Sequence, residues 1–146
     1  MKKTVAITLG IIVLICLGCG LFAQVIPYGR NHVNPPVVRE PQWNDPQTLA
    51  LAKRVCFDCH SNETVWPWYT NIAPVSWLIQ RDVDEGRRAL NFSDWQGGNS
   101  RRVAEIPRAI QRGSMPPIQY TLIHQNAILS STEKQQLIDG LQASLK

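Results

Sequence analysis

A strong net charge is absent from this chain of 146 residues. Lysine and arginine number 15 and aspartate and glutamate number 11, so the formal net charge at pH 7 is +4. Two of the lysines, Lys2 and Lys3, precede an apolar run, and the part after that run carries 13 basic and 11 acidic residues, a net charge of +2. This excess is too small for nucleic-acid binding, so we expect no nucleic-acid partner.

Alternating strand and helix signals are missing as well, and so is a second set of metal-binding residues. A dithiol redox site would need a βαβ pattern around the pair Cys56 and Cys59, and the sequence has none. A structural zinc site would need a second cysteine pair or a histidine pair at finger spacing downstream, and none follows. These absences weaken the two ordinary explanations of a Cys-x-x-Cys pair.

What the chain does contain is the sequence Cys56-Phe57-Asp58-Cys59-His60. Two thiols three residues apart, followed at once by histidine, form the attachment motif of c-type haem. On one helical turn, residues i and i+3 share a face, so both sulfurs can reach one edge of a porphyrin. The motif therefore predicts one covalent haem c per chain, with thioether bonds from Cys56 and Cys59 and with His60 as the proximal iron ligand.

Two residues are candidates for the iron ligand on the opposite face of the haem. Met115 is the only methionine besides Met1, and the prolines Pro116 and Pro117 make its loop rigid. We expect Met115 to be this distal ligand, which would raise the reduction potential. His124 is the alternative distal ligand. Each residue also has an alternative role without iron: Met115 could simply fill the core, and His124 could be a hydrogen-bonded or surface histidine.

An apolar run occupies residues 5–23, directly after the N-terminal lysines. The run is long enough to cross a membrane as a helix, and the lysines predict that the N-terminus stays in the cytoplasm. It is long for a cleavable signal peptide and lacks a good cleavage site, so we expect an uncleaved anchor over residues 1–26. Cys19 could instead be acylated, as in a bacterial lipoprotein. We expect rather that Cys16 and Cys19 act as small apolar residues that face lipid or another helix.

Prolines interrupt the chain between the anchor and the C-terminal part. Residues 27–46 contain five prolines and predict an irregular, extended spacer. His32 lies in this spacer, where we expect it to be solvated and to have no role. Residues 47–146 form the predicted haem domain.

An aromatic segment, interrupted by prolines, follows the Cys motif and is too apolar for a solvated loop. We expect its members Trp66, Trp68 and Tyr69 to pack over the porphyrin, where an indole N–H could donate to a haem propionate. Ordinary core packing is the alternative role for each of these rings.

Helical signals run through the predicted haem domain and indicate an all-α fold. Asp45 and Pro46 favour a helix start, and that helix would end at the Cys motif. Ser130 and Glu133 form a capping box ahead of a final helix, which we expect to pack against the first. Two further helices are predicted. The first covers residues 77–90, with Trp77, Leu78 and Val83 facing inward and the arginines facing outward. The second runs from Ser100 to Gly113, and its apolar positions are Val103, Ile106 and Ile110.

The chain resembles the bacterial haem-binding-domain family of membrane-anchored c-type cytochromes, and more widely the class I cytochromes c. The resemblance runs from about residue 35 to the C-terminus and rests on residues 56–64, 66–69, 72–77 and 90–95. It implies a small cytochrome c-like helical domain around one covalent haem, preceded by one transmembrane helix. It also implies haem attachment outside the cytoplasmic membrane. We therefore expect a single-pass protein of the bacterial inner membrane, with lipid around its N-terminal helix and the haem domain on the periplasmic or extracellular side.

Three classes of function stay open. In the first, His60 and Met115 fill both axial positions, and the protein carries single electrons between redox proteins rather than acting as an enzyme. In the second, the sixth ligand is labile, and the chain is a haem-based gas or redox sensor or a peroxidase-like protein, with His124 or Arg112 in the distal pocket. In the third, the chain is a membrane-tethered binding module that uses its aromatic segment.

Overall fold

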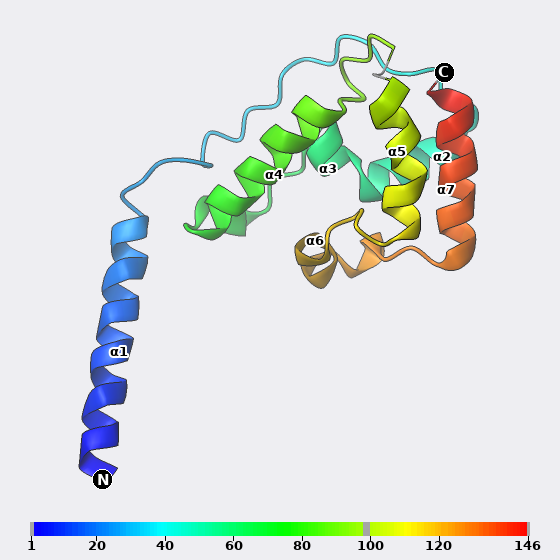
Figure 1. Cartoon of the computed structure of the whole chain (residues 1–146). Helices are drawn as coiled ribbons and strands as arrows, with labels where there is room; N and C mark the ends of the chain where they lie inside the picture. Colours follow the sequence, from blue (N-terminus) through cyan, green and yellow to red (C-terminus); the bar gives the residue numbers. More distant parts are fainter. Residues whose placement is uncertain (1, 98–99, 146) are drawn as a thin grey trace. The chain divides into compact units, whose positions relative to one another are not determined.

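Every regular element in the described part of the chain is helical. The computed structural model describes residues 2–97 and 100–145, and within them no strand is present. The all-α prediction is confirmed. The α-helices are α1 (Lys2–Ala23), α2 (Pro46–Val55), α3 (Phe57–His60), α4 (Val75–Ala89), α5 (Ser100–Gln111), α6 (Ile118–Ile123) and α7 (Ser131–Ser144), with 3₁₀ turns at Trp68–Asn71 and Gln125–Ala127 (Figure 1).

The chain divides into two compact units. The first unit comprises Met1–Val33 and Trp66–Asp82, and the second comprises Asn34–Val65 and Val83–Lys146. Helix α4 contributes to both units, because the boundary at residue 82 falls inside it.

The first unit begins with α1, which is long and apolar enough to cross a membrane. The mean hydropathy of its most apolar 18-residue window is 2.7, and none of its residues is buried. A helix that is apolar on all sides and uncovered by its own chain exposes every side chain to water unless a bilayer or a partner surrounds it.

His32 is not the solvated side chain that the sequence predicted. Its ring stacks on Trp66, with 4.7 Å between the ring centroids and 16° between the planes. Its Nε2 atom lies 3.2 Å from the carbonyl oxygen of Thr70, which can only accept a hydrogen bond. The prediction was wrong because both partners lie far along the chain, where inspection of the local sequence cannot find them.

Residues 34–45 are irregular, as the prolines predicted, yet they are bonded to the second unit. The backbone N–H groups of Val38 and Arg39 donate to the Ser93 carbonyl at 2.8 and 3.1 Å. The Trp95 N–H donates in turn to the Arg39 carbonyl at 2.9 Å. This stretch therefore belongs to the fold of the second unit.

Side chains cap the two helices that begin and end the second unit. At α2, the Asp45 carboxylate accepts hydrogen bonds from the backbone N–H (2.8 Å) and the hydroxyl (2.6 Å) of Thr48. At α7, Ser130 and Glu133 form the predicted capping box.

Hydrogen bonds from the Ser130 backbone and from Arg54 of α2 lower the pKa of Glu133 to about 2. The Arg54–Glu133 ion pair also ties α2 to α7.

The core of the second unit lies among α2, α5 and α7 (Figure 1). The final helix packs against the first helix of the predicted haem domain, which confirms that prediction. The rings of Trp43, Phe57 and Phe92 meet with centroid distances of 5.4–5.9 Å and fill the space between the Cys motif and the chain that follows α4. Leu51, Val55, Ile110, Leu137, Ile138 and Leu141 are buried around them.

Helix α4 differs from its sequence-based description in two side chains. Val83 is buried as predicted, whereas Leu78, predicted to face inward, is 44% exposed. Arg87, predicted to face outward, is partly buried, and its Nε donates to the Ser61 carbonyl at 2.8 Å. The buried residues Ser76, Val83 and Gly86 follow one face of the helix. Arg87, four residues after Val83, lies on that face, whereas Leu78, five residues before Val83, lies away from it.

Helix α5 begins at Ser100, where the sequence placed its start. Residues 98 and 99, directly before it, lie outside the described residues. Pro107 lies within the helix, and Gly113, with φ of 69°, follows its last turn. The left-handed conformation at Gly113 reverses the chain toward Met115 and is favoured by glycine.

The contact between α2 and α7 depends on Gly140. A methyl group there would lie 2.0 Å from Thr48 Oγ1 and 2.6 Å from Thr48 Cγ2. Glycine to alanine inside a helix ordinarily stabilises it by ~1 kcal/mol. Here we expect Gly140→Ala to lower the free energy of unfolding by ~1–3 kcal/mol, because overpacking forces the helices apart. Chemical denaturation measures the change.

The control for this variant is Thr48→Ala combined with Gly140→Ala. Removing Oγ1 and Cγ2 of Thr48 relieves the two closest contacts, so the double variant should recover part of the lost stability. A Gly140→Ala protein that is more stable than the parent would contradict the close approach of the two helices.

Candidate functional site

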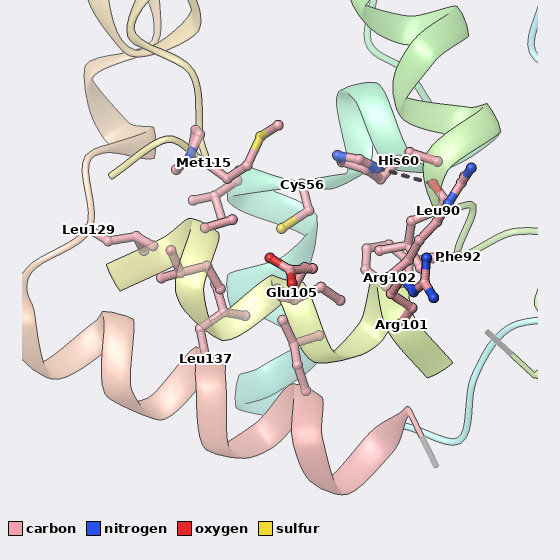
Figure 2. Close-up of a pocket in the computed structure, with 17 residues that line it drawn as sticks. Cys56, His60, Leu90, Phe92, Arg101, Arg102, Glu105, Met115, Leu129 and Leu137 are labelled. Atoms are coloured by element: carbon pink, nitrogen blue, oxygen red, sulfur yellow. Dashed lines mark hydrogen bonds between the residues drawn. The ribbon is translucent and has the colours of Figure 1, made fainter. Parts of the chain in front are cut away.

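A cavity of about 360 Å³ opens in the second unit beside the Cys motif. Its wall comes from the junction of α2 and α3, the end of α4, α5, the loop that carries Met115, and α7 (Figure 2). The volume lies within the ~300–1,000 Å³ that is usual for cofactor and small-molecule sites. Most of the wall is apolar and includes Leu90, Phe92, Ile106, Ile110, Leu137 and Leu141.

His60, the last residue of α3, lines this cavity with a fixed ring orientation. Its Nδ1 lies 3.0 Å from the Gly86 carbonyl oxygen and 3.1 Å from that of Leu90. A carbonyl only accepts, so Nδ1 carries the proton and Nε2 keeps its lone pair. Burial lowers the pKa of His60, so the ring is neutral at neutral pH. Metal-binding histidines have this arrangement, in which the second nitrogen donates to a backbone carbonyl.

Cys56 lies between α2 and α3 and lines the same cavity. Figure 2 shows its sulfur pointing into the space between the helices. Burial raises the pKa of the thiol to about 12, so it is protonated at neutral pH. Among the described residues, no group of three or more histidine, cysteine, aspartate or glutamate side chains is placed to hold a metal ion, so the site gives no support to a structural zinc site.

Cys59 is half-buried in the same helical turn and is not one of the residues that line the cavity. The N–H groups of Cys59 and His60 both donate to the Cys56 carbonyl, at 3.2 and 2.8 Å, which closes the turn. Both cysteines of the motif are free thiols.

Gly86 is the point at which α4 meets the Cys motif. A Cβ atom at this position would lie 2.2 Å from the backbone oxygen of Cys59 and 2.8 Å from its carbonyl carbon. Only glycine therefore allows α4 to approach closely enough for the Gly86 carbonyl to accept from His60. Sequence analysis missed this residue, although an isolated glycine inside a helical pattern usually has a packing reason.

Asp58, in the centre of the motif, fixes the turn from two directions. Its carboxylate accepts from the Tyr120 hydroxyl of α6 at 2.6 Å and from the Val65 N–H at 3.0 Å. Burial and this hydrogen bond raise the pKa of Tyr120, so the phenol stays protonated and donates. Sequence analysis missed the pair, because the motif leaves the residue at position 58 open and Tyr120 is 62 residues away.

Met115 lines the cavity together with His60 and Cys56. Figure 2 shows Met115 and His60 on either side of Cys56. The side chain is 43% exposed, so it lies at the edge of the apolar space. The structure therefore places both predicted iron ligands, His60 and Met115, at the same cavity.

His124, the alternative ligand, is not among the residues that line the cavity. Its ring lies edge-on to Tyr120, with 4.2 Å between the ring centroids. Arg112, named for a distal pocket, is exposed and also absent from the lining.

The aromatic residues predicted to cover the porphyrin belong to the first unit. Trp66 stacks on His32, and Trp68, which is 75% exposed, lies edge-on to Tyr69 at 5.9 Å. None of the three aromatic residues lines the cavity of the second unit. Their packing over a haem stays a prediction.

The charged side chains of the cavity wall come from one helix, α5. Arg101, Arg102 and Glu105 line the cavity from its first turns. Arg102 donates from Nη1 to the Arg88 carbonyl, which ties this end of α5 to the last turn of α4. Two basic side chains are thus placed on one side of an otherwise apolar space.

A family model described as a haem-binding domain matches residues 18–143. The chain belongs to this haem-binding-domain family. The family named from the sequence is therefore confirmed, and the protein is a haem protein. No curated protein and no solved structure matches the chain.

The residues around the cavity fit the cofactor of a haem-binding domain. A porphyrin needs an apolar slot, and the wall of this cavity is largely apolar. An iron atom needs a neutral imidazole with a free nitrogen, which the hydrogen bonds of His60 provide. The cavity wall also carries two soft sulfur groups, the thiol of Cys56 and the thioether of Met115, and the carboxylate of Glu105.

The contact at Gly86 supplies a test of the site's construction. We expect Gly86→Ala to lower the free energy of unfolding by ~1–3 kcal/mol, because the added methyl group meets the Cys59 backbone rather than a flexible side chain. The displaced carbonyl should also weaken its bond to His60 and change the haem absorption spectrum. Denaturation and spectroscopy of the haem-loaded protein measure the two effects.

Arg88→Ala is the control, because it changes an exposed side chain on the same helix. It should leave the spectrum unchanged. A Gly86→Ala protein with parental spectrum and stability would show that α4 does not set the position of His60.

Proposed function

We propose that this haem-binding-domain protein carries single electrons, with a haem c in the cavity of the second unit. One observation supports this assignment most. A single, largely apolar cavity is lined by His60, Cys56 and Met115, although Met115 lies far from the other two in the sequence. His124 does not line this cavity. A haem with both axial positions filled by protein exchanges electrons and has no open site for substrate chemistry.

Each of these residues has a separate task in the proposal. His60 would bind the iron through Nε2, because Nδ1 is held by the Gly86 and Leu90 carbonyls. Met115 would bind on the other side, and its thioether would raise the reduction potential relative to a second histidine. The apolar wall would keep water from the metal, which also raises the potential.

Covalent attachment is proposed through Cys56 and Cys59. The chain contains one Cys-x-x-Cys-His sequence, so one haem per chain follows. The free state of both thiols and their position in one helical turn are compatible with this chemistry. Arg101 and Arg102 at the cavity are suited to the two carboxylates of the porphyrin, because guanidinium groups pair with carboxylates.

Helix α1 is proposed as a membrane anchor that is not removed. The helix is apolar throughout and its own chain buries none of it, unlike a core helix of the same composition. Lys2 and Lys3 favour a cytoplasmic N-terminus, which would place the haem domain on the periplasmic or extracellular side of a bacterial inner membrane. Electron donors and acceptors would then be redox proteins that reach this face.

A sensor or peroxidase-like function is the second candidate, and the exposure of Met115 favours it. A side chain that is 43% exposed can leave an iron atom more easily than a buried one. A gas or peroxide would then take the vacated position.

The ligand role of Met115 is tested by Met115→Ala. We expect the haem to stay attached, the reduction potential to fall, and the reduced protein to bind carbon monoxide, because the sixth position loses its sulfur ligand. Absorption spectra and a redox titration measure these changes. The parent protein should bind carbon monoxide poorly, and ready binding by the parent would favour the sensor.

His124→Ala is the matched control for this experiment. Because His124 does not line the cavity, its loss should leave spectrum and potential as in the parent. If instead Met115→Ala has the parental spectrum and His124→Ala does not, the assignment of the distal ligand is wrong.

Attachment is tested by the double variant Cys56→Ser/Cys59→Ser, produced with a cytochrome maturation system. Mass spectrometry should show the added haem mass on the parent and not on the variant, because the thioether bonds need both sulfurs. The variant should also accumulate poorly, since the cavity would lack the group that fills it. Cys16→Ser/Cys19→Ser, a second Cys-x-x-Cys pair without a following histidine, is the control and should keep its haem.

A further inference from the structure

Beyond the anchor, the first unit has an exposed apolar surface that the proposed electron transfer does not use. The surface comprises side chains from the chain after α1 and from residues 66–82, and we call it the juxtamembrane face. Its members are 39–75% exposed and are Val25, Ile26, Tyr28, Trp68, Ile72, Val75 and Leu78. Exposed apolar side chains gathered in one unit mark a candidate site of contact with a protein or a membrane.

Gln24, directly after α1, joins the two segments of this face. Its side-chain Nε2 donates to the Gly20 carbonyl in the last turn of α1 (3.0 Å) and to the Ala73 carbonyl (2.8 Å). Its Oε1 accepts from the Ala73 N–H at 3.1 Å and from Arg30 at 2.9 Å. One amide therefore ties the end of the apolar helix to the centre of residues 66–82.

A second contact brings the start of α4 against the chain after α1. Gly29, with φ of 79°, lies so close to Ser76 that a Cβ atom there would be 2.3 Å from the Ser76 carbonyl oxygen. The Ser76 hydroxyl also donates to the Tyr28 carbonyl at 3.4 Å. The first turn of α4, which carries Val75 and Leu78, is thereby held next to the residues that leave α1.

The composition of the juxtamembrane face matches the boundary between lipid and water. An open groove lined by Ile26, Tyr28, Trp77, Leu78 and Arg81 combines apolar, aromatic and basic side chains. Tyrosine and tryptophan favour the headgroup level of a bilayer, where the ring is buried and its polar atom is hydrated. Arginine can extend from the same level toward lipid phosphate.

We propose that residues 66–82 lie in the headgroup region of the bilayer beside the outer end of α1, with Trp68, Ile72 and Val75 in contact with lipid. The inference rests on the proposed membrane anchor, because α1 supplies the membrane. Phospholipid is the proposed occupant because the exposed residues Val25 and Ile26 follow α1 directly, and Gln24 holds residues 66–82 to the end of that helix. The aromatic segment is then an interfacial element, comparable to a short amphipathic helix that lies in the membrane plane.

The test is photochemical labelling of the full, haem-loaded chain in phosphatidylcholine bilayers that contain a lipid with a diazirine group on one acyl chain, close to the glycerol backbone and thus next to the headgroups. After irradiation and digestion, mass spectrometry locates the lipid adducts. We expect adducts on α1 and on the peptides that carry Trp68, Ile72, Val75 and Leu78. Helix α6 is the internal control, because Ile118, Leu122 and Ile123 are 57–72% exposed but belong to the second unit.

Two matched variants sharpen the result. Trp68→Ser/Ile72→Ser should reduce labelling of residues 66–78 at least fivefold, with labelling of α1 retained. Ile118→Ser/Leu122→Ser, which removes equally exposed apolar side chains, should leave labelling of residues 66–78 unchanged. Absorption spectra of both variants verify that the haem domain is intact.

The possible results distinguish a failure of this inference from a failure of the proposal that α1 is a membrane anchor. Labelled α1 with residues 66–78 labelled no more than α6 would overturn the inference and leave the anchor standing. Unlabelled α1 would overturn both.

Discussion

The close approach of α4 to the Cys motif, at Gly86, is the constraint on which the site depends. The Gly86 carbonyl accepts from His60 Nδ1, and the Gly86 backbone lies against Cys59 where no side chain would fit. Because the histidine receives its orientation from carbonyls of α4 and of Leu90, neither the motif nor its helical turn suffices to aim the ring. The free Nε2, which an iron atom needs, is a consequence of helix packing rather than of the five-residue sequence.

Arg87 strengthens this contact from the next position along α4. Its guanidinium donates to the Ser61 carbonyl, the Asn34 side chain and the Thr64 hydroxyl, all at 2.8–2.9 Å. Ser61 and Thr64 directly follow the motif and Asn34 lies well before it, so one charged side chain joins α4 to the chain on both sides of the Cys motif. Burial lowers the pKa of Arg87, yet these acceptors satisfy its donors, which is the condition under which a partly buried charge is tolerated.

The parts that the sequence predicted are those with local causes. Asp45 and Ser130 cap their helices by accepting hydrogen bonds from backbone N–H groups three residues further along the chain. A cap and its partner therefore lie within a few residues of each other, and a short stretch of sequence is enough to predict the cap. The Cys motif is local for the same reason. His32 on Trp66, Asp58 with Tyr120, and Arg87 at the motif are paired across long sequence separations, so no window around any of them contains the partner. Leu78 was misplaced because it lies five residues before Val83, a spacing that puts it away from the buried face of α4.

The loop that carries Met115 bears on the choice between a carrier and a sensor. Exposure of the thioether alone would favour a labile ligand, but the backbone of the loop is fixed. The Ala109 carbonyl of α5 accepts from the N–H of Ser114 (3.0 Å), the N–H of Met115 (3.2 Å) and the Ser114 hydroxyl (3.1 Å). Ala109 itself lines the cavity, so these hydrogen bonds hold Met115 to the wall that would face the haem. A ligand whose backbone is tied to the cavity wall loses little further entropy on binding iron, which favours a permanently filled sixth position and hence electron transfer.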